Sequence, residues 1–265
     1  MERSSQRIVV KLGTSTLTHP SGLLNIRRIQ ELCQVLSDLK NAGHEIILVS
    51  SGAIAMGVGK LALPNRPADI PTKQAAAAVG QCELMYTYDK WFSEHNHTVA
   101  QLLLTRSDVE HSDRFMNFKN TMQRLLELGV LPIINENDTI ATEEIEIGDN
   151  DTLAAIVSES VSADLLILLS DINGLYTEDP HTNPDAALIC DIFELTDEII
   201  SSAGGAGSAF GTGGMSTKLQ AARICMQAGC DMVIANGSFP GLLYDIAEGN
   251  SVGSKFWGKK KEELS

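Results

Sequence analysis

The sequence predicts an α/β fold, a three-layer α-β-α sandwich around a mainly parallel open sheet. Apolar runs of strand length alternate with helical patterns along most of the chain, and this alternation is typical of parallel strands joined by helices. The runs are apolar at nearly every position, as expected for strands that helices cover on both faces. Polar or glycine-containing turns follow several of them, at the strand ends where open α/β sheets bind ligands.

In the first half of the chain we expect four strands, over 8–12, 45–49, 99–104 and 130–134. Asn25 can cap a helix that ends near Gly43. Its apolar stripe is expected in the core and consists of Ile26, Ile29, Leu32, Cys33, Leu36 and Leu39. Prolines mark a loop over 63–71, and helices follow over 72–92, with alanines suited to close packing, and over 115–128.

In the second half we expect strands over 165–169, 188–191 and 232–235, and helices over 152–161, from Thr196, and from beyond Lys218 to Ala228. Residues 139–147 alternate in polarity and suggest a hairpin or flap. Such a flap would bring the polar segments 135–138 and 148–151 together. Asp151 stands near the start of its helix, so simple capping remains an alternative role for the acidic residues there.

Composition limits the possible functions. The 265 residues are 43% hydrophobic and 20% charged, which suits a single domain with a sizeable core over 1–265. We expect two lobes, about 1–160 and about 161–265. The net charge of −14 argues against binding to nucleic acid or to anionic membranes.

The cysteines and the apolar runs bear on the compartment. Five cysteines form no C-x-x-C pair and we identify no signal-peptide pattern, so we expect reduced thiols in a cytoplasmic protein. The longest apolar runs are strand-sized, shorter than the roughly 20 residues of a membrane helix. We therefore expect a soluble protein.

The most informative stretch is Gly-Thr-Gly-Gly-Met-Ser-Thr-Lys over 211–218, directly before a helix. Glycines let the backbone approach an anion, and the free N–H groups of a helix start favour negative charge. Lys218 adds a mobile positive charge. The spacing fits neither a Walker A loop nor a Rossmann fingerprint, and a flexible linker remains an alternative for the octapeptide alone.

Other polar groups follow the predicted strands. They are Lys11, Ser51, the run 135–138, Ser170 with Asp171, and Asn236. A solvated lysine on an edge strand is the alternative interpretation of Lys11. Two lysines and a glycine-rich loop are the groups that a phosphoryl-transfer site requires, because in that reaction the protein positions the reactants and neutralises charge. None of the six histidines falls in these groups, which disfavours a serine-hydrolase or zinc site.

Together these motifs resemble the amino acid kinase family, and within it the glutamate 5-kinases, over essentially the whole chain. The motifs are Val-Val-Lys-Leu-Gly-Thr-Ser (9–15), Val-Ser-Ser-Gly-Ala-Ile-Ala-Met-Gly (49–57), Ile-Asn-Glu-Asn-Asp (134–138), Gly-Asp-Asn-Asp (148–151) and Gly-Thr-Gly-Gly-Met-Ser-Thr-Lys-Leu-Gln-Ala-Ala (211–222). The resemblance implies the amino acid kinase fold. It also implies ATP-dependent phosphorylation of the L-glutamate side-chain carboxylate to glutamyl 5-phosphate, the first step of proline biosynthesis, with Mg²⁺ on the nucleotide.

The resemblance also implies roles for individual residues. The phosphoryl group would pass between Lys11 and Lys218, held in place by Asp151. Glutamate would bind to Ser51, Asn135, Asp138 and Asn150, in the lobe of about 1–160. ATP would bind in the other lobe and to Lys11, through Ser170, Asp171, Thr212, Gly213, Gly214, Met215, Ser216, Thr217 and Lys218.

The same resemblance suggests proline as a feedback inhibitor, a homo-oligomer (dimer or tetramer), and a functional link to glutamyl phosphate reductase. Two departures stand out. Ser170 stands where threonine is common, and the sequence has no C-terminal PUA domain, an RNA-binding-like domain that many relatives carry. Two alternatives remain: a relative acting on acetylglutamate, carbamate, aspartate or UMP, and a non-catalytic amino-acid sensor.

Overall fold

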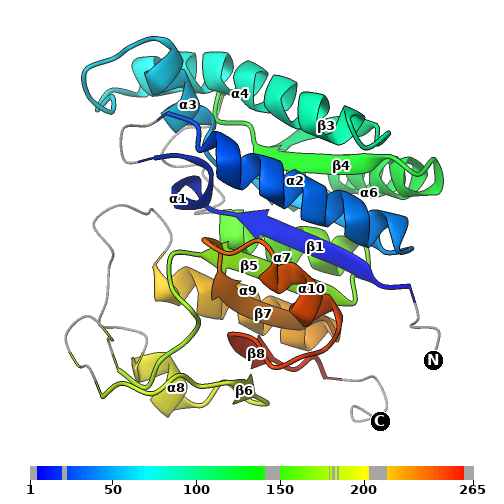
Figure 1. Cartoon of the computed structure of the whole chain (residues 1–265), viewed down its shortest axis with the longest axis vertical. Helices are drawn as coiled ribbons and strands as arrows, with labels where there is room; N and C mark the ends of the chain where they lie inside the picture. The colour runs from blue at the N-terminus through cyan, green and yellow to red at the C-terminus, as the bar shows by residue number, and fades with distance from the viewer. Residues whose placement is uncertain are drawn as a thin grey trace.

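The computed structural model describes residues 5–19, 23–140, 150–178, 180, 183, 185–202 and 214–259. Eight strands form one sheet in the order β3-β4-β2-β1-β5-β7-β8-β6 (Figure 1). They are β1 (Arg7–Leu12), β2 (Glu45–Ser50), β3 (Val99–Leu104), β4 (Leu131–Glu136), β5 (Leu165–Ser170), β6 (Asp191–Ile192), β7 (Asp231–Asn236) and β8 (Ser254–Phe256). Only the pair β7–β8 is antiparallel among these strands, so the mainly parallel open sheet is confirmed.

Helices cover both faces of this sheet (Figure 1). Buried side chains of α2, α4 and α10 form one core cluster with the strands, and those of α6, α7 and α9 form the other. The helices are α1 (Thr14–Leu17), α2 (Ile26–Asn41), α3 (Ala53–Lys60), α4 (Ile70–Ser93), α5 (Arg106–Glu110), α6 (Ser112–Glu127), α7 (Asn150–Ser160), α8 (Asp197–Ser202), α9 (Met215–Ala228) and α10 (Leu242–Ala247). The predicted three-layer sandwich is therefore confirmed.

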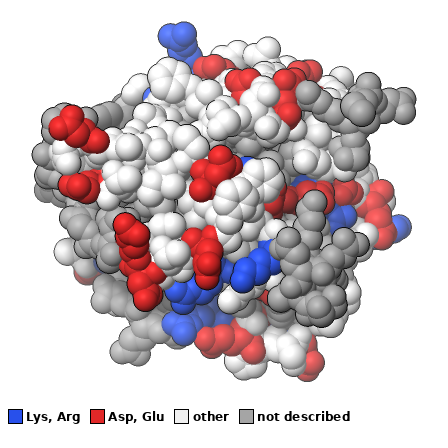
Figure 2. All heavy atoms as spheres, turned by 90° about the horizontal axis from the view of Figure 1, so that it is seen from below, with Lys and Arg blue, Asp and Glu red and all other residues white. Residues whose placement is uncertain are grey.

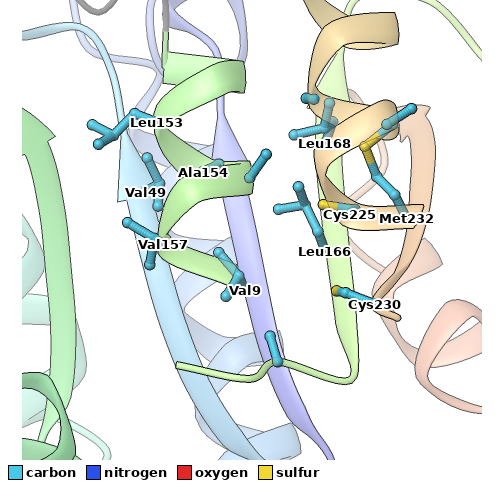
Figure 3. Close-up of a cluster of buried hydrophobic side chains, with 14 of the residues drawn as sticks. Val9, Val49, Leu153, Ala154, Val157, Leu166, Leu168, Cys225, Cys230 and Met232 are labelled. Carbon is cyan, nitrogen blue, oxygen red and sulfur yellow. The ribbon is translucent and has the colours of Figure 1, made fainter. Parts of the chain in front are cut away.

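Helix α7 is anchored on the sheet by its apolar side chains. Figure 3 shows Leu153 and Val157 of α7 beside Val9 of β1 and Val49 of β2, and all four are fully buried. Burying such side chains contributes about 1.5–3 kcal/mol each. The first turn of α7, where the site begins, is thus held over the sheet by packing.

Helices α3 and α4 are in backbone contact. A Cβ added at Gly80 would lie 1.7 Å from the Ala53 carbonyl oxygen, and one at Gly57 would lie 1.8 Å from that of Ala76. Only glycine permits this approach. The close packing expected of the alanine-rich helix is confirmed, and the two glycines make it possible.

Several expectations need correction. The stripe of α2 is buried at every predicted position but Ile26, which is 62% exposed, because it is the first residue of the helix and lies outside the helix–sheet contact. Asn25 caps α2 as expected. Helix α4 begins at Ile70, with Pro71 in its first turn. The strand expected over 188–191 is reduced to β6 and an isolated bridge from Leu188 to Tyr176.

The surface agrees with the acidic composition. Figure 2, which views the molecule from the side of β6 and β8, shows acidic groups spread over this face with basic side chains between them. Within the described ranges, no helix combines the length and the apolar character needed to cross a bilayer. All five cysteines are free thiols, as expected.

Candidate active site

The polar groups predicted at strand ends share one edge of the sheet. Strands β1, β2, β4, β5 and β7 are parallel, so their carboxyl ends lie together. Strand β1 is central, with β2 on one side and β5 on the other, and the chain crosses from one side of β1 to the other between β4 and β5. Such a switch in strand order is where open α/β sheets bind ligands.

Two lysines converge on one buried carboxylate at this edge. The Lys11 Nζ lies 2.6 Å from Asp151 Oδ1, and the Lys218 Nζ lies 3.1 Å from Asp151 Oδ2. The lysine side chains are 10% and 8% exposed, and that of Asp151 is fully buried. Lys11 therefore lies on a central strand and has an ionic partner, which excludes the alternative that it is a solvated lysine on an edge strand.

The charge state of Asp151 follows from its neighbours. Burial raises the pKa of this carboxyl group, but attraction to Lys11 and to Lys218, with hydrogen bonds from both, outweighs burial and leaves the pKa below its ordinary value. Asp151 is therefore ionised at neutral pH. Asp151 thus brings two ammonium groups together at this end of the sheet, where positive charge would stabilise an anion.

The start of α9 differs from the prediction. The helix begins at Met215 rather than beyond Lys218, so Lys218 lies in its first turn and the free N–H groups belong to residues 214–217. The Thr217 hydroxyl lies 2.7 Å from the Gly214 carbonyl oxygen and 3.2 Å from Asp151 Oδ2. Thr212 and Gly213 lie outside the described residues, as do Asp149 and most of the expected flap over 139–147.

Beside the lysines lies a network of neutral side chains. The Asn150 Nδ2 donates to the Ser51 hydroxyl at 2.7 Å, to Asn135 Oδ1 at 3.1 Å and to the Ser50 carbonyl at 3.3 Å. The Asn135 Nδ2 donates in turn to Gln81 Oε1 at 2.9 Å. We call Ser51, Asn150, Asn135 and Gln81 the amide relay. It joins the ends of β2 and β4 to the first turn of α7 and to α4.

Backbone geometry supports the relay. Gly52, between Ser51 and α3, has a φ angle of +100°, a backbone conformation that residues other than glycine rarely adopt. This turn sets the direction in which the Ser51 hydroxyl leaves β2. The remaining predicted substrate residue, Asp138, follows β4 and lines a narrow pocket with Gln81 and Glu136.

The ends of β5 and β7 carry the other predicted polar residues. Ser170 pairs in register with Asn236, and its hydroxyl donates to Asp171 Oδ1 at 3.1 Å. Asp171 is exposed. These residues line the same sheet edge as the two lysines, as predicted. The described residues contain no cluster of three or more His, Cys, Asp or Glu side chains placed to hold a metal ion.

Comparison with known proteins identifies the family. The model of the amino acid kinase family matches residues 6–236. The chain belongs to the amino acid kinase family. A glutamate 5-kinase of Clostridium perfringens is 53% identical over 98% of this chain and 98% of its own length. The glutamate 5-kinase of Listeria innocua is 52% identical over 98% of this chain and 96% of its own length.

A solved structure agrees on the fold of this amino acid kinase. Carbamate kinase from Giardia lamblia bound to AMP-PNP superposes with a TM-score of 0.69, covering 98% of this chain and all of that one. Its sequence identity is only 16%, so the likeness supports the architecture alone.

In this amino acid kinase the predicted site residues fall into three groups. Lys11, Asp151 and Lys218 are in direct contact. Ser51, Asn135 and Asn150 are joined by hydrogen bonds. The third group follows β4, ends or follows β5, or begins α9, and in it the Thr217 hydroxyl contacts Asp151. Its members are Asp138, Ser170, Asp171, Gly214, Met215, Ser216 and Thr217.

Sequence reasoning missed Gln81. It lies on α4 and is 7% exposed, within a helix assigned to packing alone. A signal existed, because Ala77, Gln81, Leu84 and Tyr88 are spaced by four, three and four residues, so a polar side chain occupies the buried stripe. Buried polar side chains are informative because they need a hydrogen-bond partner.

Proposed function

We propose that this protein transfers the γ-phosphoryl group of ATP to the side-chain carboxylate of L-glutamate, forming glutamyl 5-phosphate in the first step of proline biosynthesis. One observation carries the proposal: two lysine ammonium groups meet a single buried carboxylate, Asp151, at the switch point of the sheet. The glutamate 5-kinases that resemble the whole chain at 53% and 52% identity support the same reaction.

The acceptor explains the charge arrangement. Bringing a carboxylate to the γ-phosphate of ATP sets two anions together, and positive charge must offset their repulsion. We assign this role to Lys11 and Lys218. Asp151 is the positioning residue, because its two oxygens accept from the two ammonium groups. The substrate itself supplies the nucleophilic oxygen, so no protein base is required.

The amide relay fits the glutamate. Ser51, Asn135 and Asn150 offer neutral donors and acceptors next to Asp151, and Asp138 offers a carboxylate for an ammonium group. Neutral partners add no net charge beside an anionic acceptor. We therefore propose that the relay orients glutamate so that its side-chain carboxylate faces the two lysines.

We propose that the start of α9 binds the phosphates of the nucleotide. The free N–H groups of residues 214–217 and the Lys218 ammonium group suit the phosphates, with Thr212 and Gly213 as further proposed contacts. Mg²⁺ would neutralise phosphate charge when bound. Asp151 does not fit as its ligand, because both of its oxygens face lysines, whereas the exposed Asp171 at the end of β5 and the phosphate oxygens fit it.

The test is ADP release from ATP and Mg²⁺ with glutamate, N-acetylglutamate, aspartate, carbamate and UMP as separate acceptors. Hydroxylamine is present to trap an acyl phosphate as a hydroxamate. We expect glutamate-dependent ADP and a trapped hydroxamate. Turnover on another acceptor alone would assign a different amino acid kinase activity. A folded protein that binds ATP or glutamate without turnover would be a sensor, although a sensor has no use for two lysines poised around Asp151.

Further features of the proposal concern regulation and assembly. We expect proline to compete with glutamate at the relay, because the two amino acids share a head group, and glutamate saturation curves unchanged by proline would contradict this. We also propose a cytoplasmic homo-oligomer, functionally linked to a glutamyl phosphate reductase. Its first lobe, about 1–160, would bind glutamate and its second, about 161–265, would bind ATP.

A further inference from the structure

Gln81 is buried, contacts the proposed glutamate site and has no assigned role. Its Oε1 accepts from Asn135 Nδ2 at 2.9 Å, while its Nε2 is enclosed and has no hydrogen-bond partner among the described residues. An enclosed donor without an acceptor is unfavourable, because the group has lost its hydrogen bond to water and gained none in return. Such a donor calls for a ligand.

The backbone fixes which way the Gln81 amide faces. A backbone N–H can only donate, so the Asn135 atom at 2.9 Å from the Glu136 N–H must be the oxygen. The Asn135 amino group then faces Gln81, and the Gln81 atom that meets it must be the oxygen. The amino group of Gln81 is left over at the end of the relay.

The other end of the relay gives the same answer. The Ser50 carbonyl can only accept, so the Asn150 atom facing it is the amino group. That group also donates to Asn135 Oδ1, consistent with the assignment from Glu136. The relay therefore ends in one donor, Gln81 Nε2, and one acceptor, Asn150 Oδ1, both without a hydrogen-bond partner among the described residues.

The pocket beside Gln81 suits the ammonium group of an amino acid. Its lining includes Gln81, the carboxylates Glu136 and Asp138, and the small residues Ala53 and Ala77. The open space is about 10 Å³, close to the room that one water-sized group needs. Two carboxylates attract an ammonium group, and a fixed amide donor accommodates one carboxylate oxygen. The α-carbon of an amino acid carries both groups.

We propose that Gln81 is a specificity-determining residue whose Nε2 donates to the α-carboxylate of the substrate, while Asp138 faces its ammonium group. This inference rests on the proposed function. The far end of the same substrate then faces Asn150 and the lysine pair around Asp151. Gln81 would thus select α-amino acids over amines that carry only the reacting carboxylate.

Two glutamate analogues separate these contacts. Glutarate keeps both carboxylates and lacks the ammonium group, whereas 4-aminobutyrate keeps the ammonium group and the reacting carboxylate and lacks the α-carboxylate. Binding of both, and of glutamate, is measured by calorimetry in the presence of a non-hydrolysable ATP analogue. This readout does not depend on turnover, so it is separate from the test of the reaction.

Gln81→Met removes the amide, and Gln81→Glu keeps the acceptor for Asn135 but loses the donor. For both variants we expect glutamate and glutarate to bind about 10-fold to 100-fold more weakly, with 4-aminobutyrate changed less than about 2-fold. Asp138→Asn should weaken glutamate and 4-aminobutyrate but spare glutarate. Thr87→Val is the matched control, a buried residue of the same helix whose hydroxyl donates to the Glu83 carbonyl.

Equal weakening of all three ligands in the Gln81 variants would make Gln81 a purely structural residue and overturn the inference. Unchanged glutarate binding would overturn it as well. A wild-type protein that does not phosphorylate glutamate would instead refute the proposed function. Melting temperatures of each variant identify any that lose the fold, and Gln81→Glu, which preserves the bond to Asn135, keeps the test decisive if Gln81→Met is unstable.

Discussion

The lysine pair and the amide relay lie side by side at one sheet edge but differ in how they are held. Lys11 and Lys218 are buried, and both contact the same buried carboxylate, that of Asp151. The relay is neutral, and its orientation is fixed by backbone groups at both ends. In the proposed function the charged lysine pair stabilises the phosphoryl group during transfer, and the neutral relay binds and orients the substrate. The two regions should therefore fail in different ways.

The largest effect should come from removing a lysine. For Lys11→Ala or Lys218→Ala we expect kcat to fall about 100-fold to 1000-fold, because a charge that stabilises the transferring phosphoryl group is lost. Steady-state kinetics with glutamate and ATP measure it. Lys60→Ala is the control, since the Lys60 side chain is 57% exposed and pairs with Glu83 on the surface. A near-normal kcat in either lysine variant would refute the assigned role.

Removing the shared carboxylate should affect stability. For Asp151→Asn we expect a loss of about 3–5 kcal/mol in the free energy of unfolding at neutral pH, because two buried ammonium groups lose their partner. Urea unfolding of wild type and variant measures the difference. A variant as stable as the wild type would contradict this, and would show that solvent or another group stabilises the two lysines when the carboxylate is removed.

The difference in unfolding free energy between the wild type and Asp151→Asn should depend on pH in a defined direction. The folded-state pKa of Asp151 lies below the ordinary value of 3.8, so the unfolded chain takes up the proton first as the pH falls. The stability from Asp151 is fully present above pH 3.8 and is lost as the pH falls through the folded-state pKa. We expect the gap between wild type and Asp151→Asn to be constant near neutrality and to narrow below pH 3.8. A gap that widens in acid would contradict this.

The lysine pair was more predictable from the sequence than the relay. Lys11, Asp151 and Lys218 stand at element ends, where a charge among apolar residues is conspicuous. Their contact, across 67 residues for Asp151 and Lys218, depends on how α7 and α9 pack over the sheet. Local patterns carry no information on that distance, so only the family resemblance suggested it.

The misses have physical causes. Gln81 was hidden because a helix rich in alanine suggests packing, and its role appears only when Asn135 is brought beside it by β4. The start of α9 was placed too late, because Met215, Ser216 and Thr217 after glycines gave no helical periodicity. Strand β8 and helix α10 are only three and six residues long, too short for a pattern to repeat, and their pairing with neighbours decides their conformation.

The smallest effect should come from removing the Ser51 hydroxyl from the relay. Ser51→Ala removes the hydroxyl that accepts from Asn150 at 2.7 Å, a hydrogen bond of about 0.5–1.5 kcal/mol, so KM for glutamate should rise about 2-fold to 10-fold with kcat nearly unchanged. Ser158→Ala is the control, a fully buried serine of α7 whose hydroxyl donates to the Ala154 carbonyl. A fall in kcat without a change in KM would contradict this. Ser51 would then act in phosphoryl transfer with the lysine pair, and Asn135 would remain in substrate recognition.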